Sequence, residues 1–413
     1  MRRRVCSIKV MAIVLVSMLV RTSVSWAVDE HVPHVLSGSR RIGDIVERGR
    51  TQIVYSDSVV KQATVRGEQI LCITARAEGT TIQAGGVQRI IAGIAKNTII
   101  EAGGHQYVLH GGGIAEGTTI YGHQDVSDNG IAKDTTIYGR QEVCASGIAE
   151  GTIIQAGGKM TAESGSIISE IDNSGLVKLK TPDPLINTIK NYTGRSGSVL
   201  KVETLDVYPI VHPTANFPAA TLEGRTVLED GAEVKLSGLT GTLIMSDEVC
   251  SRGGVIKIDV ASDLLSGGLV IIGGMVEGLV KIAITLSGAV MDIDEPTTVA
   301  DFLRPYPILG ISGSGFGMGR PVGEDEHQDR VLVRRRQIVR FTTEEAKAEA
   351  NFEFNHLPPN YEVVEENDGY YLCLVRSKKT GMRSFGQVFK NVMRDCFSRC
   401  CGCFFNDEEK KED

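Results

Sequence analysis

Aromatic side chains are scarce in this chain, and it has no net positive charge. Phe, Trp and Tyr make up 5% of its 413 residues, with a single Trp, whereas glycine occurs 47 times. Aromatic rings usually dominate the interior of a compact globule, so this composition argues against one and favours a narrow core of Ile, Val and Ala. The formal net charge is −7, and no basic stripe interrupts the central region. We therefore expect no nucleic-acid partner.

A disulfide framework and a long apolar run are missing as well. Cys6 lies within the leader described next, and the remaining cysteines are scattered without framework spacing, which does not favour a disulfide-stapled fold. The apolar run at residues 10–20 is too short to span a bilayer, which requires about 20 residues.

Residues 1–27 have the pattern of a secretory signal peptide. Arg2, Arg3 and Arg4 precede the apolar run, and Ser25-Trp26-Ala27 is a suitable cleavage site. The pattern predicts export through the Sec pathway and a mature chain that begins near Val28. A retained N-terminal anchor is the alternative.

What the sequence has in abundance is repetition. The phrases AEGTTIQAGGVQ, AKNTIIEAGGHQ, AEGTTIYGHQ, AKDTTIYGRQ and AEGTIIQAGGK follow one another within residues 63–158. The β-branched runs in them are too short for helices and are punctuated by turn residues. A fixed step of about 17 to 20 residues predicts that each repeat is one coil of a stacked β-solenoid. The aligned aliphatic positions are Val65, Ile82, Ile100, Ile120, Ile137 and Ile154.

Stacked coils place equivalent residues in columns, and three columns follow from the phrases. A corner that tolerates a left-handed backbone is predicted at Gly79, Asn97, Gly117, Asp134 and Gly151. Two structural ladders are predicted, one of Thr80, Thr98, Thr118, Thr135 and Thr152, the other of Gln69, Gln88, Gln106, Gln124 and Gln141. Side-chain amides in such a column hydrogen-bond from rung to rung. Cys72 and Cys144 share a column but lie about 19 Å apart at one strand spacing per coil, beyond disulfide reach, and we interpret them as small core residues.

The domain organisation follows from changes in composition along the chain. We predict a signal peptide (1–27), an N-terminal cap or linker (28–62), a regular repeat solenoid (63–165), an irregular distal solenoid (166–300), a Gly-rich linker (301–328), a β cap (329–376), a basic Cys-containing amphipathic helix (377–405) and an acidic tail (406–413). The linker contains GSGFGMG, which lacks the Lys-Ser/Thr step of a phosphate loop. In the cap, NFEFNHL and YEVVEENDGYYLCLV are expected to form a hairpin around a Pro-Pro-Asn turn.

The segment 377–405 carries apolar residues at helical spacing opposite Lys390, Arg394 and Arg399. Three interpretations stay open: packing against the solenoid or another chain, attachment to a membrane through acylated cysteines, and zinc binding. The cysteines concerned are Cys396, Cys400, Cys401 and Cys403.

The phrase G-I-A-x-G/N/D-T-T-I-x-x-G-G-x-Q-x-V resembles the repeat of AIDA-like autotransporter adhesins. Further on, LSGLTGTLIMSDEV and IDVASDLLSGGLVIIGGMVEGLVKIAI are similar to the distal passenger of pertactin-like autotransporters. The resemblance implies a right-handed parallel β-solenoid with a C-terminal cap, displayed at a bacterial surface. Members of that family continue into an outer-membrane β-barrel, whereas the residues after Arg376 have a helical pattern, so we expect a passenger without that translocator.

The competing hypothesis is that the chain is an enzyme, because β-solenoids also include polysaccharide lyases and hydrolases. Asp125 and Glu142 lie one coil apart in one column, with Arg140 and His123 beside them, a spacing that suits a retaining glycosidase. His105 and His123 share a column too and could hold a metal, although a solvated surface column explains all of these residues more simply. We therefore predict no catalytic residue, no metal and no cofactor.

The function that the sequence favours is that of an adhesin-like binding or structural protein, secreted or displayed at the cell surface. The expected partner is a protein or glycan on a host or neighbouring cell, and the binding candidates are Tyr107, Tyr121 and Tyr138. The first alternative is a secreted effector held at a membrane by its C-terminal helix, and the second is the polysaccharide-degrading enzyme.

Overall fold

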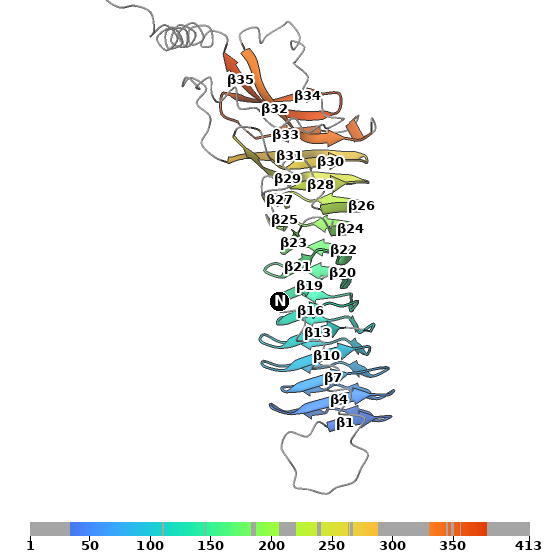
Figure 1. Ribbon diagram of the computed structural model, residues 1–413. Coiled ribbons are helices and arrows are strands. Elements are labelled where there is room, and N and C mark those ends of the chain that lie inside the picture. Colours follow the sequence, from blue (N-terminus) through green and yellow to red (C-terminus); the bar gives the residue numbers. More distant parts are fainter. Residues whose placement is uncertain are drawn as a thin grey trace, which may run out of the picture.

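The computed structural model describes residues 34–377, except for 110, 145, 183–186, 206–219, 238–240, 263, 265–266, 288–329, 344–345, 348–350 and 356. In this part the chain is an all-β parallel solenoid, which confirms the predicted fold class (Figure 1). The predicted signal peptide, the Gly-rich linker, the acidic tail and the C-terminal helix after Ser377, with its four cysteines, lie outside the described residues.

Each regular coil has three short strands, which form three faces. The first face consists of β1 (His34–Ser37), β4 (Thr51–Tyr55), β7 (Glu68–Leu71), β10 (Val87–Ile91), β13 (His105–Leu109), β16 (His123–Val126) and β19 (Arg140–Val143). The second face consists of β2 (Arg40–Ile42), β5 (Val59–Lys61), β8 (Arg76–Glu78), β11 (Ile94–Lys96), β14 (Ile114–Glu116) and β17 (Ile131–Lys133). The third face consists of β3 (Ile45–Val46), β6 (Thr64–Val65), β9 (Thr81–Ile82), β12 (Ile99–Ile100), β15 (Thr119–Ile120) and β18 (Thr136–Ile137).

The coils become irregular from β20 onward. β20 (Ile148–Ile154) pairs with both β17 and β18 and so joins the second and third faces. The strands that follow are β21 (Lys159–Glu163), β22 (Ile167–Asn173), β23 (Leu176–Pro182), β24 (Asn187–Gly194), β25 (Val199–Leu205), β26 (Ala220–Leu228), β27 (Glu233–Ser237), β28 (Thr242–Met245), β29 (Val249–Ala261), β30 (Leu269–Ile272) and β31 (Val276–Ser287).

Residues 34–62, where the sequence suggested a cap or linker, are coils in the same register as those that follow. β1 pairs with β4, β2 with β5 and β3 with β6, all in parallel. This stretch lacks the Gly-Thr-Thr-Ile phrase but keeps the inward-facing pattern, because Val54, Val60 and Val46 continue the buried columns.

Parallel pairing places equivalent residues of successive coils directly above one another, as the repeat period predicts. Ile82, Ile100, Ile120, Ile137 and Ile154 are register partners in successive coils, and all are fully buried. The predicted corner is left-handed in every coil, with φ of 68° at Gly79, 52° at Asn97 and 51° at Asp134. Asn and Asp tolerate this conformation better than other side chains do.

Both predicted ladders are buried, but only one of them is hydrogen-bonded. Each Gln Nε2 donates to the Oε1 of the Gln in the preceding coil, from Gln69 (2.8 Å) to Gln141 (2.7 Å). The column begins one coil earlier than predicted, at Gln52, whose Nε2 donates to Asp44 Oδ2 at 2.9 Å. The Thr hydroxyls are equally buried, yet none of the five has a hydrogen-bond partner in the described structure.

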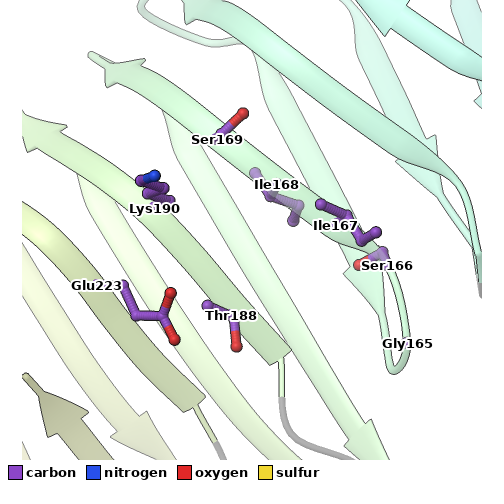
Figure 2. Close-up of a pocket in the computed structure, with 8 residues that line it drawn as sticks. All are labelled: Gly165, Ser166, Ile167, Ile168, Ser169, Thr188, Lys190 and Glu223. Atoms are coloured by element: carbon purple, nitrogen blue, oxygen red, sulfur yellow. The ribbon is translucent and has the colours of Figure 1, made fainter.

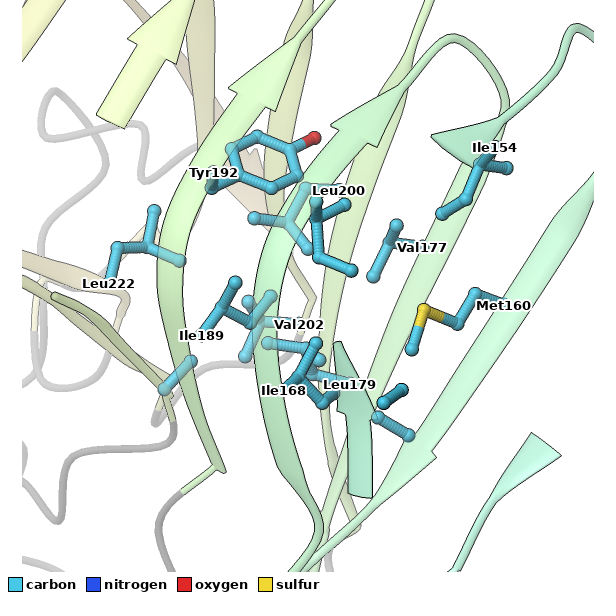
Figure 3. Packing of buried hydrophobic residues seen from close by; sticks show 14 of the residues in the cluster. Ile154, Met160, Ile168, Val177, Leu179, Ile189, Tyr192, Leu200, Val202 and Leu222 are labelled. Carbon is cyan, nitrogen blue, oxygen red and sulfur yellow. The ribbon is translucent and has the colours of Figure 1, made fainter. Parts of the chain in front are cut away.

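The interior changes character where the regular phrases end. Met160 follows Gln141 in its column, Ile168 follows Ala149, and Ile171 follows Thr152. Figure 3 shows this larger apolar core, in which Tyr192 is the largest fully buried side chain. Its hydroxyl accepts a hydrogen bond from Asn173 Nδ2 at 2.9 Å, and burial raises the pKa of Tyr192 to about 12.

The cap combines antiparallel pairing with parallel pairing to the last coils, and it differs in part from the predicted hairpin. It contains β32 (Arg330–Phe341), β33 (Asn351–Phe354), β34 (Tyr361–Glu366) and β35 (Gly369–Ser377). β34 and β35 form the hairpin, around the Asn-Asp-Gly turn signal, and β32 pairs with the other edge of β35. β33, which was expected in that hairpin, instead pairs in parallel with β31 of the solenoid. The Tyr361 hydroxyl donates to the Ser262 carbonyl at 2.7 Å and so ties the cap to the last coils.

Candidate binding faces

Tyr121 and Tyr138 lie where the third face ends and the chain turns into the first. Each directly follows a buried isoleucine, and each backbone N–H donates to the isoleucine carbonyl of the preceding coil at 2.8 Å. Their rings stack with centroids 4.9 Å apart and planes 11° from parallel. The two residues are 50% and 45% exposed, so the structure places a fixed pair of aromatic rings in solvent.

A tight turn connects this pair to the first face. Gly122 separates Tyr121 from His123, and a Cβ at that position would lie 2.4 Å from the carbonyl oxygens of Glu101 and Gly104 in the previous coil. Only glycine fits at such a distance. The close approach of the coils therefore fixes where the tyrosine backbone sits.

Tyr107, the third predicted binding residue, does not join the pair. It lies on the outer side of β13, in register with Arg89 and Asp125. The Arg89 guanidinium stands over its ring, 4.6 Å from the centroid, and Arg89 Nε also bonds Glu68 at 2.8 Å. Tyr107 is thus held in a polar network on the first face, beside the cluster described next.

His123, Asp125, Arg140 and Glu142 form this cluster, on the outer side of the first face. His123 is the register partner of Arg140, and Asp125 of Glu142, as their spacing predicts. His123 Nε2 lies 2.7 Å from Asp125 Oδ1, and Arg140 donates to Glu142 Oε1. One ligand-type atom each from His123, Asp125 and Glu142 lies within 4.8 Å of the others. Each carboxylate is thus paired with a nitrogen-bearing neighbour.

His105 extends the cluster into the preceding coil. It is in register with His123, and the two rings meet edge to face with centroids 4.7 Å apart. Partial burial lowers the pKa of His105 below its usual value, and the neighbouring His123 lowers it further. The shared column that the sequence predicted for the two histidines is therefore present as a ring contact.

A column of alternating charge at the end of the second face was missed by the sequence reasoning. Its members are Lys61, Glu78, Lys96, Glu116, Lys133 and Glu150, register partners in successive coils. Three ion pairs are formed, at 2.8 Å for Lys61–Glu78, 2.7 Å for Lys96–Glu116 and 3.0 Å for Lys133–Glu150. The signal was present in the alternation of Ala-Glu and Ala-Lys that opens each phrase.

The hollows found on the described surface are open, and both polar and apolar side chains line them. Figure 2 shows one of about 480 Å³, where Ser169, Lys190 and Glu223 continue the charged column across β22, β24 and β26. A second, of about 790 Å³, includes Arg48, Arg50 and Arg66. Neither is lined by the aromatic side chains typical of small-molecule pockets, and neither includes Asp125 or Glu142.

Cys72 and Cys144 are free thiols, but they are not core residues as the sequence suggested. Both lie half-buried just past the end of first-face strands. Burial, together with Glu163 and other carboxylates, raises the pKa of Cys144 to about 11. Cys396, Cys400, Cys401 and Cys403 lie outside the described residues, so their acylation or metal binding stays a prediction.

No protein-family model matches this chain, and no curated protein matches it. One solved structure that it resembles is the crystal structure of a TibC-catalysed, hyper-glycosylated fragment of TibA. The match covers 62% of this chain and 89% of that one, with 22% sequence identity and a TM-score of 0.40. Within the described part of the chain, no helix has the length and apolar character needed to cross a membrane.

Proposed function

We propose that this chain is an exported, adhesin-like β-solenoid that binds a protein or glycan on the surface of another cell. The observation that carries the proposal is the solvent-exposed Tyr121–Tyr138 stack on a rigid scaffold. Tyrosine offers a large amphipathic contact area at low conformational cost, which is why it is enriched in binding surfaces.

The scaffold lowers the cost of binding further. The backbone of both tyrosines is hydrogen-bonded to the coils beneath them, and each ring already packs on the other. Few rotamers are lost when a partner covers them, so more of the contact energy is available as affinity. Export and surface display are supported by the signal-peptide pattern of residues 1–27 and by the adhesin-like repeat phrase.

The proposal is tested by measuring binding of the labelled mature chain to intact cells and to an immobilised glycan panel. We expect saturable binding that Tyr121→Ala weakens at least tenfold. Tyr55→Ala is the matched control, because Tyr55 is also exposed (42%) but lies in another column. Absence of saturable binding, or equal losses in both variants, would contradict the proposal.

Cleavage of a polysaccharide is a second candidate, favoured by the adjacent carboxylates of Asp125 and Glu142. Both carboxylates are paired with His123 or Arg140, and neither surface hollow includes them, whereas an enzyme site is usually a cleft that encloses its substrate. Reducing-end release from acidic and neutral polysaccharides, lost in Glu142→Gln, would establish this activity. No release by the wild type from any of them would eliminate it.

A further inference from the structure

Three partly buried side chains of the first-face cluster each bring one ligand-type atom to within 4.8 Å of the others. They are His123 and Asp125 on β16 and Glu142 on β19. We propose that these residues form a binding site for a divalent transition-metal ion of the zinc type, independent of the tyrosine pair. The site would join two neighbouring coils through one ion.

The backbone sets the position of these side chains before any ion binds. Parallel pairing makes Asp125 and Glu142 direct register partners, and His123 lies two positions before Asp125 on the same side of β16. The side chains of His123, Asp125 and Glu142 are 20%, 22% and 29% exposed, so their freedom is limited while solvent still reaches them. His105, edge-on against His123, further restricts rotation of that ring.

The donor set indicates the class of metal. One imidazole nitrogen with two carboxylate oxygens suits Zn²⁺, which often takes three protein ligands and leaves its fourth position to water. Ca²⁺ and Mg²⁺ prefer oxygen ligands alone and gain nothing from His123. The two donor atoms of His123 and Asp125 are 2.7 Å apart, whereas two ligands of a tetrahedral zinc ion stand about 3.3 Å apart. Small side-chain rotations therefore open the pair to admit the ion.

Without an ion, the cluster holds two like charges in adjacent rungs. Asp125 and Glu142 repel each other, and the described structure offsets this repulsion with His123 and Arg140. A metal ion would provide stronger neutralisation at the same place. Arg140 donates to Oε1 of Glu142 only, so the other carboxylate oxygen is the natural ligand. The guanidinium is still a like charge beside the ion and should reduce its affinity.

The test is calorimetric titration of the full mature chain with ZnCl₂. Every protein in the series carries Cys396→Ser, Cys400→Ser, Cys401→Ser and Cys403→Ser, so that the C-terminal thiols cannot bind the metal. The variants are His123→Gln, Asp125→Asn and Glu142→Gln. Glu150→Gln is the matched control, because Glu150 is an equally ion-paired rung of the charged column. Circular dichroism verifies that each variant is folded.

We expect one Zn²⁺ per chain, binding weakened at least tenfold in each of the three ligand variants, and unchanged binding in Glu150→Gln. Arg140→Gln should tighten binding several-fold, because it removes the competing charge. With Cu²⁺ as a probe, electron paramagnetic resonance should show imidazole-nitrogen coupling that His123→Gln abolishes. Wild-type affinity in His123→Gln and Glu142→Gln, or no binding by the wild type, would overturn the proposal.

Discussion

The rings of Tyr121 and Tyr138 stack across two adjacent coils, with centroids 4.9 Å apart and planes 11° from parallel. Their separation matches the spacing between parallel strands, so the stack is a direct product of the coil register. An aromatic pair of this kind contributes about 0.5–1.5 kcal/mol beyond the area it buries. Removing one ring should therefore leave the solenoid folded, and a binding defect in Tyr121→Ala can be assigned to the lost surface.

The glutamine ladder is expected to stabilise the regular coils, most strongly at its middle. Gln106→Leu leaves Gln88 Oε1 without its donor and Gln124 Nε2 without its acceptor, each at a cost of about 1–3 kcal/mol. Gln141→Leu orphans only Gln124 Oε1 and removes the Gln141 Oε1 that has no partner in the described structure. The urea midpoint of Gln106→Leu should therefore lie well below that of Gln141→Leu. A wild-type midpoint in Gln106→Leu would show that the ladder does not contribute to stability.

The threonine column should respond in the opposite direction. The Thr118 hydroxyl is buried and has no hydrogen-bond partner among the described residues, so Thr118→Val removes an uncompensated polar group and keeps the β-branched shape. We expect the melting temperature of Thr118→Val to rise. Thr118→Ser keeps the hydroxyl and loses the methyl group, so its melting temperature should fall. A destabilised Thr118→Val would indicate that the hydroxyl is hydrogen-bonded in solution.

Much of the solenoid could be predicted because each coil repeats one short phrase. Because the number of residues per coil is nearly constant, the members of each column can be predicted from the sequence. Ile100, Gln106 and Thr118 lie where the period puts them. What could not be predicted depends on contacts between columns. The sequence predicts Tyr107, Tyr121 and Tyr138 together as binding residues and places Tyr121 and Tyr138 as stacked neighbours, which the structure shows. It does not reveal that the Arg89 guanidinium lies over the ring of Tyr107. The buried residues beyond Met160 could not be predicted for a related reason. The irregular coils no longer have a constant number of residues between equivalent positions.

The charged column predicts a specific pH dependence. The hydrogen bond from Lys61 lowers the pKa of Glu78 below its usual value, and the charge of Lys61 adds to the effect. A carboxylate with a lowered folded-state pKa stabilises the fold above its unfolded pKa and loses that contribution as the pH falls through the folded value. Lys61→Met should therefore melt below the wild type at neutral pH, and the difference should shrink in acid and in high salt. A difference that is independent of pH and salt would point to lost packing of the lysine stem.

Membrane association through residues 377–405 is a separate prediction from the sequence. Deleting residues 385–405 should move the protein from the membrane fraction to the soluble fraction if the cysteine-bearing helix attaches it. Replacing the four cysteines by serine distinguishes acylation from amphipathic binding, because only acylation requires the thiols. Identical fractionation of the intact and deleted chains would eliminate this mode of attachment.

The central claim is that the regular coils present a binding surface centred on the stacked tyrosines. The most direct measurement is an equilibrium binding isotherm on intact target cells for the wild type, Tyr121→Ala, Tyr138→Ala, their double variant and the control Tyr55→Ala. We predict that both single variants lose at least tenfold in affinity, with unchanged melting behaviour. The double variant should lose less than the product of the two single losses, because the stacked rings act as one unit. Wild-type affinity in the folded double variant would contradict the claim.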